Sequence, residues 1–280
     1  MVQKTIGIYS DTSSYSPFNE DTLIVEVSNE HIACLVKNVK TNSVTAFEFF
    51  KLEIEGGDWD DIFYEIRTNS GLLDKSYEAT RIYYNLPENT FIPSYKFTGP
   101  NANLFLSLVH GDDAKSSIYH DTVKGDVDFV NAYRIKNNLL ETVNRNFLSI
   151  QGQHVYTSIL NMLAEDETIK KEILMKVQFY HAYFIVTVMR NGKLQLMQRF
   201  NYQTPEDVLY HLLNVAEKFE LVVPRLQLSG FIDLQSPTYQ YLQQHFTDIY
   251  MELVELEEPM NQKINNYPLH YFSPFFNLQA

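Results

Sequence analysis

One stretch in the second half of the chain decides the fold: LMKVQFYHAYFIVTVMRNGKLQLMQRFNYQTPED, residues 174–207. It holds three runs rich in β-branched and aromatic residues, at 174–180, 183–190 and 194–200, and Asn-Gly between the last two is a strong hairpin signal. The closing Thr-Pro-Glu-Asp has the pattern of a helix start, with a threonine cap, proline in the first position and acids in the first turn. We therefore predict three antiparallel strands followed by a helix.

The first half of the chain repeats this order. Its β-rich runs are separated by short polar turns and occupy residues 23–27, 31–36 and 44–50. Asp58 is the expected N-cap of a helix that ends near residue 70, and a further strand is predicted at 80–84. After the helix of the second half, strands are predicted at 225–229 and 249–254, with a helix near 238–245 between them.

This order of elements predicts the fold class. Three antiparallel strands followed by α/β crossovers form the ribonuclease H-like arrangement, and two copies in one chain form the architecture of actin-like or sugar-kinase-like ATPases. We therefore predict an α/β protein with two ribonuclease H-like subdomains in an actin-like arrangement, each a mixed sheet with a three-stranded meander plus helices.

The predicted boundaries follow from the same pattern. They are a loose lead-in at 1–20, a first subdomain at 21–168 with elements inserted at about 100–165, a second subdomain at 172–258, and an aromatic tail at 259–280. Within the insertion we expect a helix near 101–110, then an acidic loop, a strand near 127–134 and a helix near 136–145.

Composition narrows the function classes. The 280 residues are 45% hydrophobic and carry a net charge of −13, which excludes a disordered chain and makes nucleic acid a poor partner, because the field repels phosphate. The single cysteine, Cys34, allows no internal disulfide and is expected as an inert core thiol. No stretch is apolar enough for a secretory signal or a membrane span, so we predict a cytoplasmic protein without membrane insertion.

Part of the chain resembles a known family. Residues 188–194 (VMRNGKL) and 198–213 (QRFNYQTPEDVLYHLL) are similar to a family of uncharacterised Bacteroidetes proteins, a domain of unknown function with an actin-like ATPase fold. Weaker matches lie at 81–97, 228–232 and 270–272, so the resemblance covers about residues 20–275. It implies the fold and a distant similarity to pilus-assembly and cell-division actin-like proteins. It implies no established reaction.

The resemblance implies where a nucleotide would bind. Actin-like ATPases hold phosphate with two β-hairpins, each with an Asp followed by small residues, because phosphate oxygens must approach backbone N–H groups. By register, Glu26 stands at the Asp position and Ser28 at the Gly position of the first hairpin. This hairpin keeps a carboxylate and a small residue.

The second hairpin departs further from that pattern. Gln178 stands at the Asp position and Tyr180 at the Gly position, followed by His181, so bulky side chains occupy the place of phosphate. The adenosine motif, normally a strand running into two or three glycines, keeps only Gly230. We therefore interpret the six positions, including Glu26 and Ser28, as a vestigial nucleotide cleft.

Two other segments carry residues that could form a site. The sequence around His110, Asp113, His120 and Asp121 is the densest His/Asp cluster, but it also reads as a solvated loop, so no metal and no cofactor is predicted. The tail carries aromatic residues that cannot sit comfortably in water: Tyr267, Tyr271, Phe272, Phe275 and Phe276. It either folds back onto its own domain or docks to a partner or to a second copy.

The functional prediction is a non-catalytic, actin-like binding or scaffold protein with degenerate phosphate loops. The alternatives are a nucleotide-binding ATPase that uses Glu26 and Ser28, and a self-assembling dimer or filament module. A protein partner or self-association is expected in each non-catalytic case.

Overall fold

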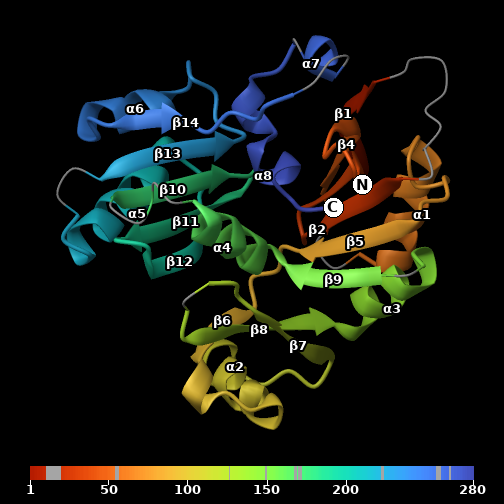
Figure 1. The fold of residues 1–280 in the computed structure, drawn as a ribbon, viewed down its shortest axis with the longest axis horizontal. Coiled ribbons are helices and arrows are strands. Elements are labelled where there is room, and N and C mark those ends of the chain that lie inside the picture. The colour runs from red at the N-terminus through yellow and green to blue at the C-terminus, as the bar shows by residue number, and fades with distance from the viewer. Residues whose placement is uncertain are drawn as a thin grey trace. The chain divides into compact units, whose positions relative to one another are not determined.

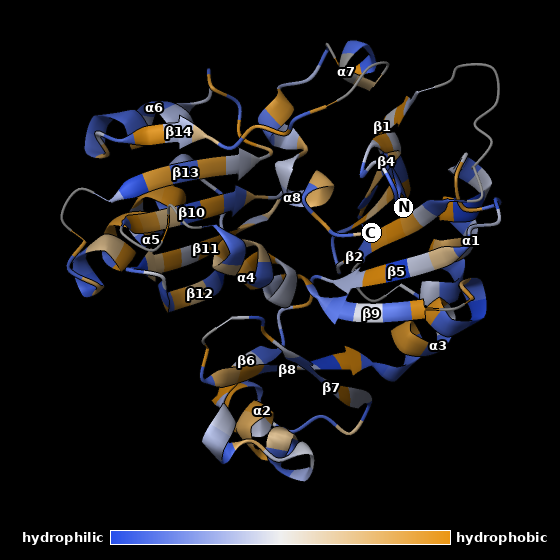
Figure 2. Cartoon of the chain, viewed as in Figure 1, coloured by the Kyte–Doolittle hydropathy of each residue, from blue (hydrophilic) through white to orange (hydrophobic). Residues whose placement is uncertain are grey.

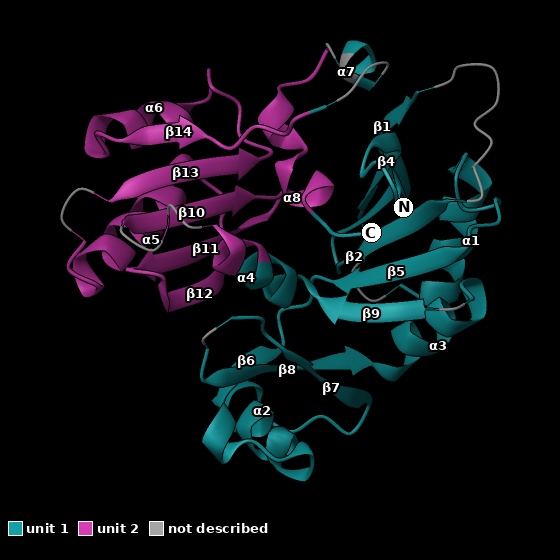
Figure 3. Cartoon of the chain, viewed as in Figure 1, with its two compact units in different colours: residues 1–161, 256–265, 278–280 teal, residues 162–255, 266–277 magenta. Residues whose placement is uncertain are grey.

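A computed structural model describes the chain except for residues 11–19, 54–56, 126, 149, 167–168, 170–171, 222–223, 257–259 and 265 and the side chain of residue 261 (Figure 1). Hydrophobic residues are concentrated on the central strands, such as β2 (Asp21–Val27) and β11 (Tyr183–Arg190) (Figure 2). The chain forms two compact units (Figure 3). Unit 1 holds residues 1–161, 256–265 and 278–280, and unit 2 holds residues 162–255 and 266–277.

Unit 1 is built on a six-stranded sheet with the order β1-β4-β3-β2-β5-β9. Its remaining strands are β1 (Val2–Tyr9), β3 (His31–Asn38), β4 (Val44–Leu52), β5 (Ala79–Tyr84) and β9 (Ile150–His154). Strands β2, β3 and β4 form the predicted antiparallel meander. Strand β5 pairs in parallel with β2, and β9 pairs in parallel with β5. Helices α1 (Trp59–Asn69) and α3 (Asn137–Asn146) pack on one face, where Val25, Ile62 and Val143 share a core.

A smaller sheet is inserted between β5 and β9. It has the order β6-β8-β7, from β6 (Asn89–Pro93), β7 (Ser116–Thr122) and β8 (Phe129–Lys136). Helix α2 (Ala102–His110) packs on it through Ala102 and Leu106, and α4 (Val155–Glu165) follows β9. The helix, strand and following helix predicted within the insertion are therefore present.

Unit 2 repeats the topology of unit 1. Its sheet has the order β12-β11-β10-β13-β14, from β10 (Ile173–Phe179), β11, β12 (Lys193–Asn201), β13 (Arg225–Gly230) and β14 (Ile249–Met251). Strands β10 to β12 are antiparallel neighbours, and β13 and β14 are parallel to β10 and β13. Helices α5 (Pro205–Lys218) and α6 (Pro237–His245) complete the unit. Because β4-β3-β2-β5-β9 has the same order and directions, the predicted duplication is confirmed.

Local signals behave as the sequence predicts. Thr204 caps α5 in a reciprocal pair with Asp207, and Asp58 caps α1 by accepting from the N–H of Asp60. Asn191 and Gly192 both have positive φ, 52° and 73°, as a two-residue hairpin turn requires. These elements depend on neighbours in sequence, which is why spacing alone identified them.

Two predictions need correction. Residues 2–9, expected in the loose lead-in, form β1, which pairs antiparallel with β4. The strand is held there because the side chains of Ile6 and Ile8 are buried. Residues 11–19 of the lead-in lie outside the described residues. Residues 116–122, expected in an acidic loop, form β7 by pairing with β8, although their side chains are mostly exposed and show no apolar alternation.

The last part of the chain divides between the units. It contains α7 (Met260–Lys263) in unit 1, and the short turn Leu269–Tyr271 and α8 (Ser273–Phe276) in unit 2. In the described part of the chain, no helix is both long and apolar enough to cross a membrane.

Candidate functional site

Glu26, predicted to stand at the Asp position of the first hairpin, is buried near the end of β2 with 1% of its surface exposed. Its Oε1 accepts a hydrogen bond from Asn85 Nδ2 at 2.8 Å and lies 2.9 Å from Nε2 of His31. Its Oε2 has no hydrogen-bond partner among the described residues. One carboxylate oxygen is therefore held by the protein itself, and the other is buried without a donor from any residue that the structure describes.

Ser28, predicted to stand at the Gly position of this hairpin, is fully buried. Its hydroxyl accepts from the backbone N–H groups of Glu30 at 3.1 Å and His31 at 3.0 Å, and it lies 2.9 Å from Nδ1 of His31. The serine thus closes its own turn, as serine commonly does. A chain of contacts runs from Ser28 through the His31 ring to Glu26.

Sequence reasoning missed His31. The imidazole bridges the two predicted site residues and stacks on Phe49, with ring centroids 5.0 Å apart. The available signal was its position: His31 begins β3 directly after the turn that follows Glu26. A histidine across a tight turn from a carboxylate is well placed to contact it.

At the second hairpin, Tyr180 and Tyr183 are fully buried, and their rings stack with centroids 4.6 Å apart and planes 14° from parallel. The backbone N–H of Tyr180 donates to the carbonyl of Tyr183 at 2.8 Å, and Tyr202 donates its hydroxyl to the carbonyl of Tyr180 at 3.0 Å. The ring, the N–H and the carbonyl of Tyr180 therefore all make contacts inside unit 2.

Beside this turn, two side-chain oxygens are buried without a hydrogen bond to the described part of the chain. Gln178 and Ser229 are register neighbours on β10 and β13, and Gln178 Oε1 and Ser229 Oγ find no partner within the described residues. Gln178 is 3% exposed and Ser229 is fully buried. Polar atoms therefore lie at the position where the resemblance predicted a carboxylate.

Gly230 has a structural reason to be glycine. Its φ is +80°, and a Cβ atom placed there would lie 2.0 Å from the carbonyl oxygen of Phe179. The next residue, Phe231, stacks on the exposed ring of His181 with centroids 4.5 Å apart and planes 9° from parallel. This glycine is therefore required by the strand end itself, independently of any nucleotide.

The C-terminal tail packs over the second hairpin. Phe275 meets Tyr180 edge to face at 6.0 Å and lies 5.9 Å from Phe231. His270 Nε2 lies 2.8 Å from the carbonyl oxygen of Ile232, and Ser273 donates its hydroxyl to a backbone carbonyl of unit 2 at 2.6 Å. These contacts anchor the tail within its own unit.

The aromatic residues expected for docking are mostly inaccessible. Phe272, Phe275 and Phe276 are 0%, 1% and 4% exposed, while Tyr267 and Tyr271 are partly exposed. Of the two alternatives for the tail, the structure shows the packed one for the three phenylalanines. A buried aromatic ring has a lower free energy than one exposed to water, and for this reason the three rings do not project as a docking peptide.

The final residues contact unit 1. Lys37 donates to the carbonyl of Leu278 at 2.8 Å, and Tyr83 donates its hydroxyl to the carbonyl of Gln279 at 2.9 Å. Lys37 is only 4% exposed, and this burial lowers the pKa of its ammonium to about 8.

The His/Asp cluster of the insertion is not assembled. His110 Nε2 lies 2.9 Å from the carbonyl of Asn89, and Asp113 accepts from Lys136. Asp121 accepts from the backbone N–H of His154 at 2.7 Å, and its burial raises its pKa. Among the residues that the structure describes, no group of three or more His, Cys, Asp or Glu side chains could hold a metal ion.

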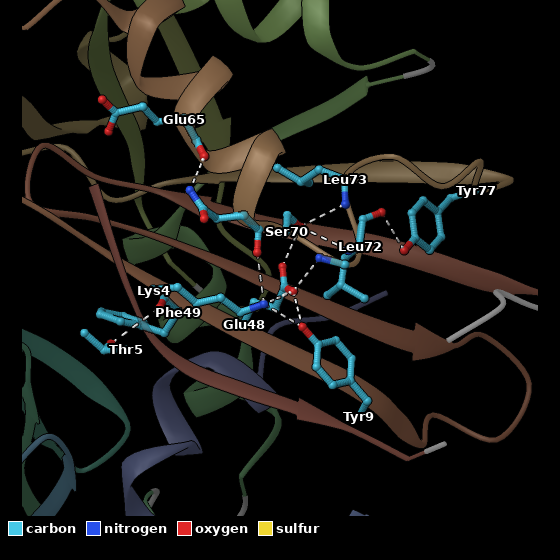
Figure 4. Close-up of polar contacts among 12 residues, drawn as sticks. Lys4, Thr5, Tyr9, Glu48, Phe49, Glu65, Ser70, Leu72, Leu73 and Tyr77 are labelled. Carbon is cyan, nitrogen blue, oxygen red and sulfur yellow. Dashed lines mark hydrogen bonds and ion pairs between the residues drawn. The ribbon is translucent and has the colours of Figure 1, made fainter. Parts of the chain in front are cut away.

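A separate buried polar cluster surrounds Glu48 on β4 (Figure 4). Its carboxylate accepts from Lys4 Nζ at 2.5 Å, from the Tyr9 hydroxyl, from Ser70 Oγ at 2.5 Å and from the N–H of Gly71 at 2.8 Å. Glu48 ties β1 and the turn after α1 to the sheet. All four donors belong to the protein, so the cluster has the character of a structural anchor.

Unit 1 also contains a cavity of about 1190 Å³ beside the first hairpin. Asn29 and Glu30 of the hairpin turn, Trp59 at the start of α1, and Asn138 and Glu141 of α3 are among its lining residues. Trp59 is the single tryptophan of the chain, so its fluorescence reports on this region of unit 1.

Residues 12–249 match the family described as protein of unknown function, DUF3822. The chain belongs to this family. A search of curated proteins finds no match.

Solved structures share the fold. A Bacteroides thetaiotaomicron protein with an actin-like ATPase fold and unknown function has a TM-score of 0.71 at 16% identity, covering 84% of this chain and 91% of that one. A chain of the PilM–PilN type IV pilus biogenesis complex has a TM-score of 0.58 at 9% identity, covering 92% and 97%. The ethanolamine utilization protein EutJ from Carboxydothermus hydrogenoformans has a TM-score of 0.51 at 7% identity, covering 95% and 91%.

These likenesses establish the fold alone. The DUF3822 chain has the actin-like ATPase fold, as its element order predicted. At such low identities, what the neighbours bind or do does not transfer to this chain.

Proposed function

We propose that this DUF3822 protein is a non-catalytic binding or scaffold protein that has kept the actin-like fold without ATP hydrolysis. The observation that carries the proposal is the buried stack of Tyr180 and Tyr183 beneath Phe275. By the register that the family resemblance implies, this is the turn at which the second phosphate hairpin of an actin-like ATPase would approach its nucleotide.

The backbone of this turn argues in the same direction. A phosphate site needs free N–H groups, and the N–H of Tyr180 already donates to Tyr183. Phosphate could reach it only if the tyrosine and phenylalanine rings left the core, and truncating one buried aromatic residue typically costs about 3–5 kcal/mol. A nucleotide would have to offset that loss before any net binding appeared.

The first hairpin supports the proposal through the hydrogen bonds of its polar side chains. The Ser28 hydroxyl accepts N–H groups of its own turn, and one oxygen of Glu26 is held by His31 and Asn85. Groups that would meet magnesium and phosphate are therefore used inside the protein.

A second candidate is nucleotide binding through Glu26 and Ser28. One observation favours it: Glu26 Oε2 is buried and lacks a donor among the described residues. A buried carboxylate oxygen without a partner is costly, and the water shell of a magnesium ion would supply a donor.

Calorimetric titration with Mg-ATP and Mg-ADP distinguishes the two candidates. We expect no saturable heat, and no rise in the thermal unfolding midpoint at millimolar nucleotide. A bound nucleotide at 100 times its Kd would stabilise the fold by about 2.7 kcal/mol, which is readily measured. Saturable binding that Glu26→Gln abolishes, while the exposed control Glu20→Gln retains it, would overturn the proposal.

We further propose that the partner is a protein or a second copy of the chain, because a net charge of −13 disfavours nucleic acid. The fold neighbour from the PilM–PilN complex is itself a member of a protein assembly, which is consistent with a scaffold role on this fold. We also propose a cytoplasmic location, with which the buried free thiol of Cys34 is consistent.

A further inference from the structure

Helix α2 of the inserted sheet exposes an unusual amount of apolar side chain. Leu104, Leu108 and Val109 are 66%, 83% and 62% exposed, and Phe105 beside them is only partly buried. We call these four residues the α2 face. They lie at i, i+1, i+4 and i+5, so they form one continuous stripe over two turns of the helix.

Leu104, Leu108 and Val109 of the α2 face lie outside the core of the insertion, and only Phe105 also packs against it. The helix packs inward through Ala102 and Leu106, which are 1% and 0% exposed. An ordinary surface helix is polar on the side opposite its core, whereas on α2 the exposed Leu104 and Leu108 extend the apolar surface beyond the buried residues. Contiguous exposed apolar residues of this kind mark a contact surface.

Charge indicates which partner fits. The insertion, residues 89–136, carries five Lys or Arg and five Asp or Glu, so it is neutral, although the whole chain has a net charge of −13. Residues 97–111 contain no Lys, Arg, Asp or Glu. Two copies of the chain repel each other elsewhere, but this lobe adds no repulsion when two copies meet through it. A charged partner would find nothing to pair with on this face.

We propose that the α2 face is the contact through which two copies of this chain associate as a two-fold dimer. With the two-fold axis perpendicular to the helix, Leu104 of one copy lies near Leu108 of the other. The two helices then run antiparallel, which places opposite ends of their dipoles together.

The size of the face predicts a weak dimer. A nine-residue helix is about 14 Å long, which is shorter than a standard interface of about 800 Å² per partner requires. Association is therefore expected at high concentration rather than as a permanent dimer. Added salt is expected to strengthen it slightly, because salt screens the repulsion between the acidic parts of the two chains.

Sedimentation of the full chain between about 1 μM and 1 mM tests the proposal in the range expected for weak complexes. We expect a reversible monomer–dimer equilibrium and a rise in Kd of at least about tenfold for Leu108→Asp, because a charge enters an apolar contact. The matched control is Leu148→Asp, since Leu148 is 85% exposed and lies outside the α2 face. It makes the same change in charge and is expected to leave Kd within about twofold.

A second measurement locates the contact. With a bifunctional maleimide, Leu108→Cys is expected to give a covalent dimer and Leu148→Cys is not, while Cys34 is buried and does not compete. A chain that stays monomeric up to 1 mM, or a dimer unchanged by Leu108→Asp, would overturn the proposal. Because neither readout uses nucleotide, its failure is distinguishable from failure of the proposed function.

Discussion

The sharpest test of the structure is the neutralisation of Glu48 by Glu48→Gln. The side chain of Glu48 is fully buried and accepts from Lys4, Tyr9, Ser70 and the N–H of Gly71. Glutamine has nearly the same shape, but it is uncharged, loses one acceptor oxygen and points an NH₂ group at donors. At least one buried donor is then left without a partner.

The magnitude follows from these contacts. Breaking a buried ion pair costs about 3–5 kcal/mol, and hydrogen bonds to charged groups contribute about 1.5–3 kcal/mol each. These terms are not additive, and Lys4 is 26% exposed and can return to water. We therefore expect Glu48→Gln to lower the free energy of unfolding by about 3 kcal/mol.

Urea unfolding followed by the fluorescence of Trp59 is the assay, because the single tryptophan lies in unit 1 with Glu48. The midpoint should fall with little change in the slope m. The control is Glu20→Gln, which removes an ion pair to Lys40 whose side chains are 44% and 72% exposed. That change is expected to cost less than about 0.5 kcal/mol.

A double-mutant cycle with Lys4→Met adds a coupling term. Since Lys4 and Glu48 are in direct contact, we expect an interaction energy of about 1–3 kcal/mol. If Glu48→Gln cost less than about 1 kcal/mol, the argument from unsatisfied buried donors would be refuted for this cluster.

Two further predictions concern residues that contact the C-terminal tail, Lys37 in unit 1 and Tyr180 in unit 2. Burial lowers the pKa of Lys37 to about 8, so between about pH 8 and 10 the unfolded chain binds more protons and the free energy of unfolding rises with pH. Urea unfolding of wild type and Lys37→Met should show a difference that changes by about 2 kcal/mol across this window, whereas a constant difference would contradict the assignment. Tyr180→Ala and Phe275→Ala should each cost about 3–5 kcal/mol, and the double variant should lose about 0.5–1.5 kcal/mol less than their sum, because both remove the same ring contact. Strict additivity in urea unfolding followed by circular dichroism, which reports on both units, would show that the two rings do not depend on each other.

The candidate site was only partly predictable. The register of the meander placed Glu26 and Ser28 at the first hairpin and Tyr180 at the second, and the structure finds all three buried at those turns. It also brings His31 between the first two, and no motif of the sequence announced that contact. The bridging role of His31 depends on the hairpin closing, since only then do the two strands bring its ring beside the carboxylate.

What the sequence alone determined is local. The hairpin at Asn191, the capped helix after Thr204 and the repeated meander depend on residues a few positions apart, and their spacing predicted an α/β fold with a duplicated topology. Only the tertiary structure decided whether the aromatic residues of the tail are buried. Whether its aromatic residues are buried or exposed depends on what covers them, and Lys37 meets Leu278 across 241 positions of the chain. Burial arises from contacts between distant segments, and the spacing of residues within one segment does not encode it.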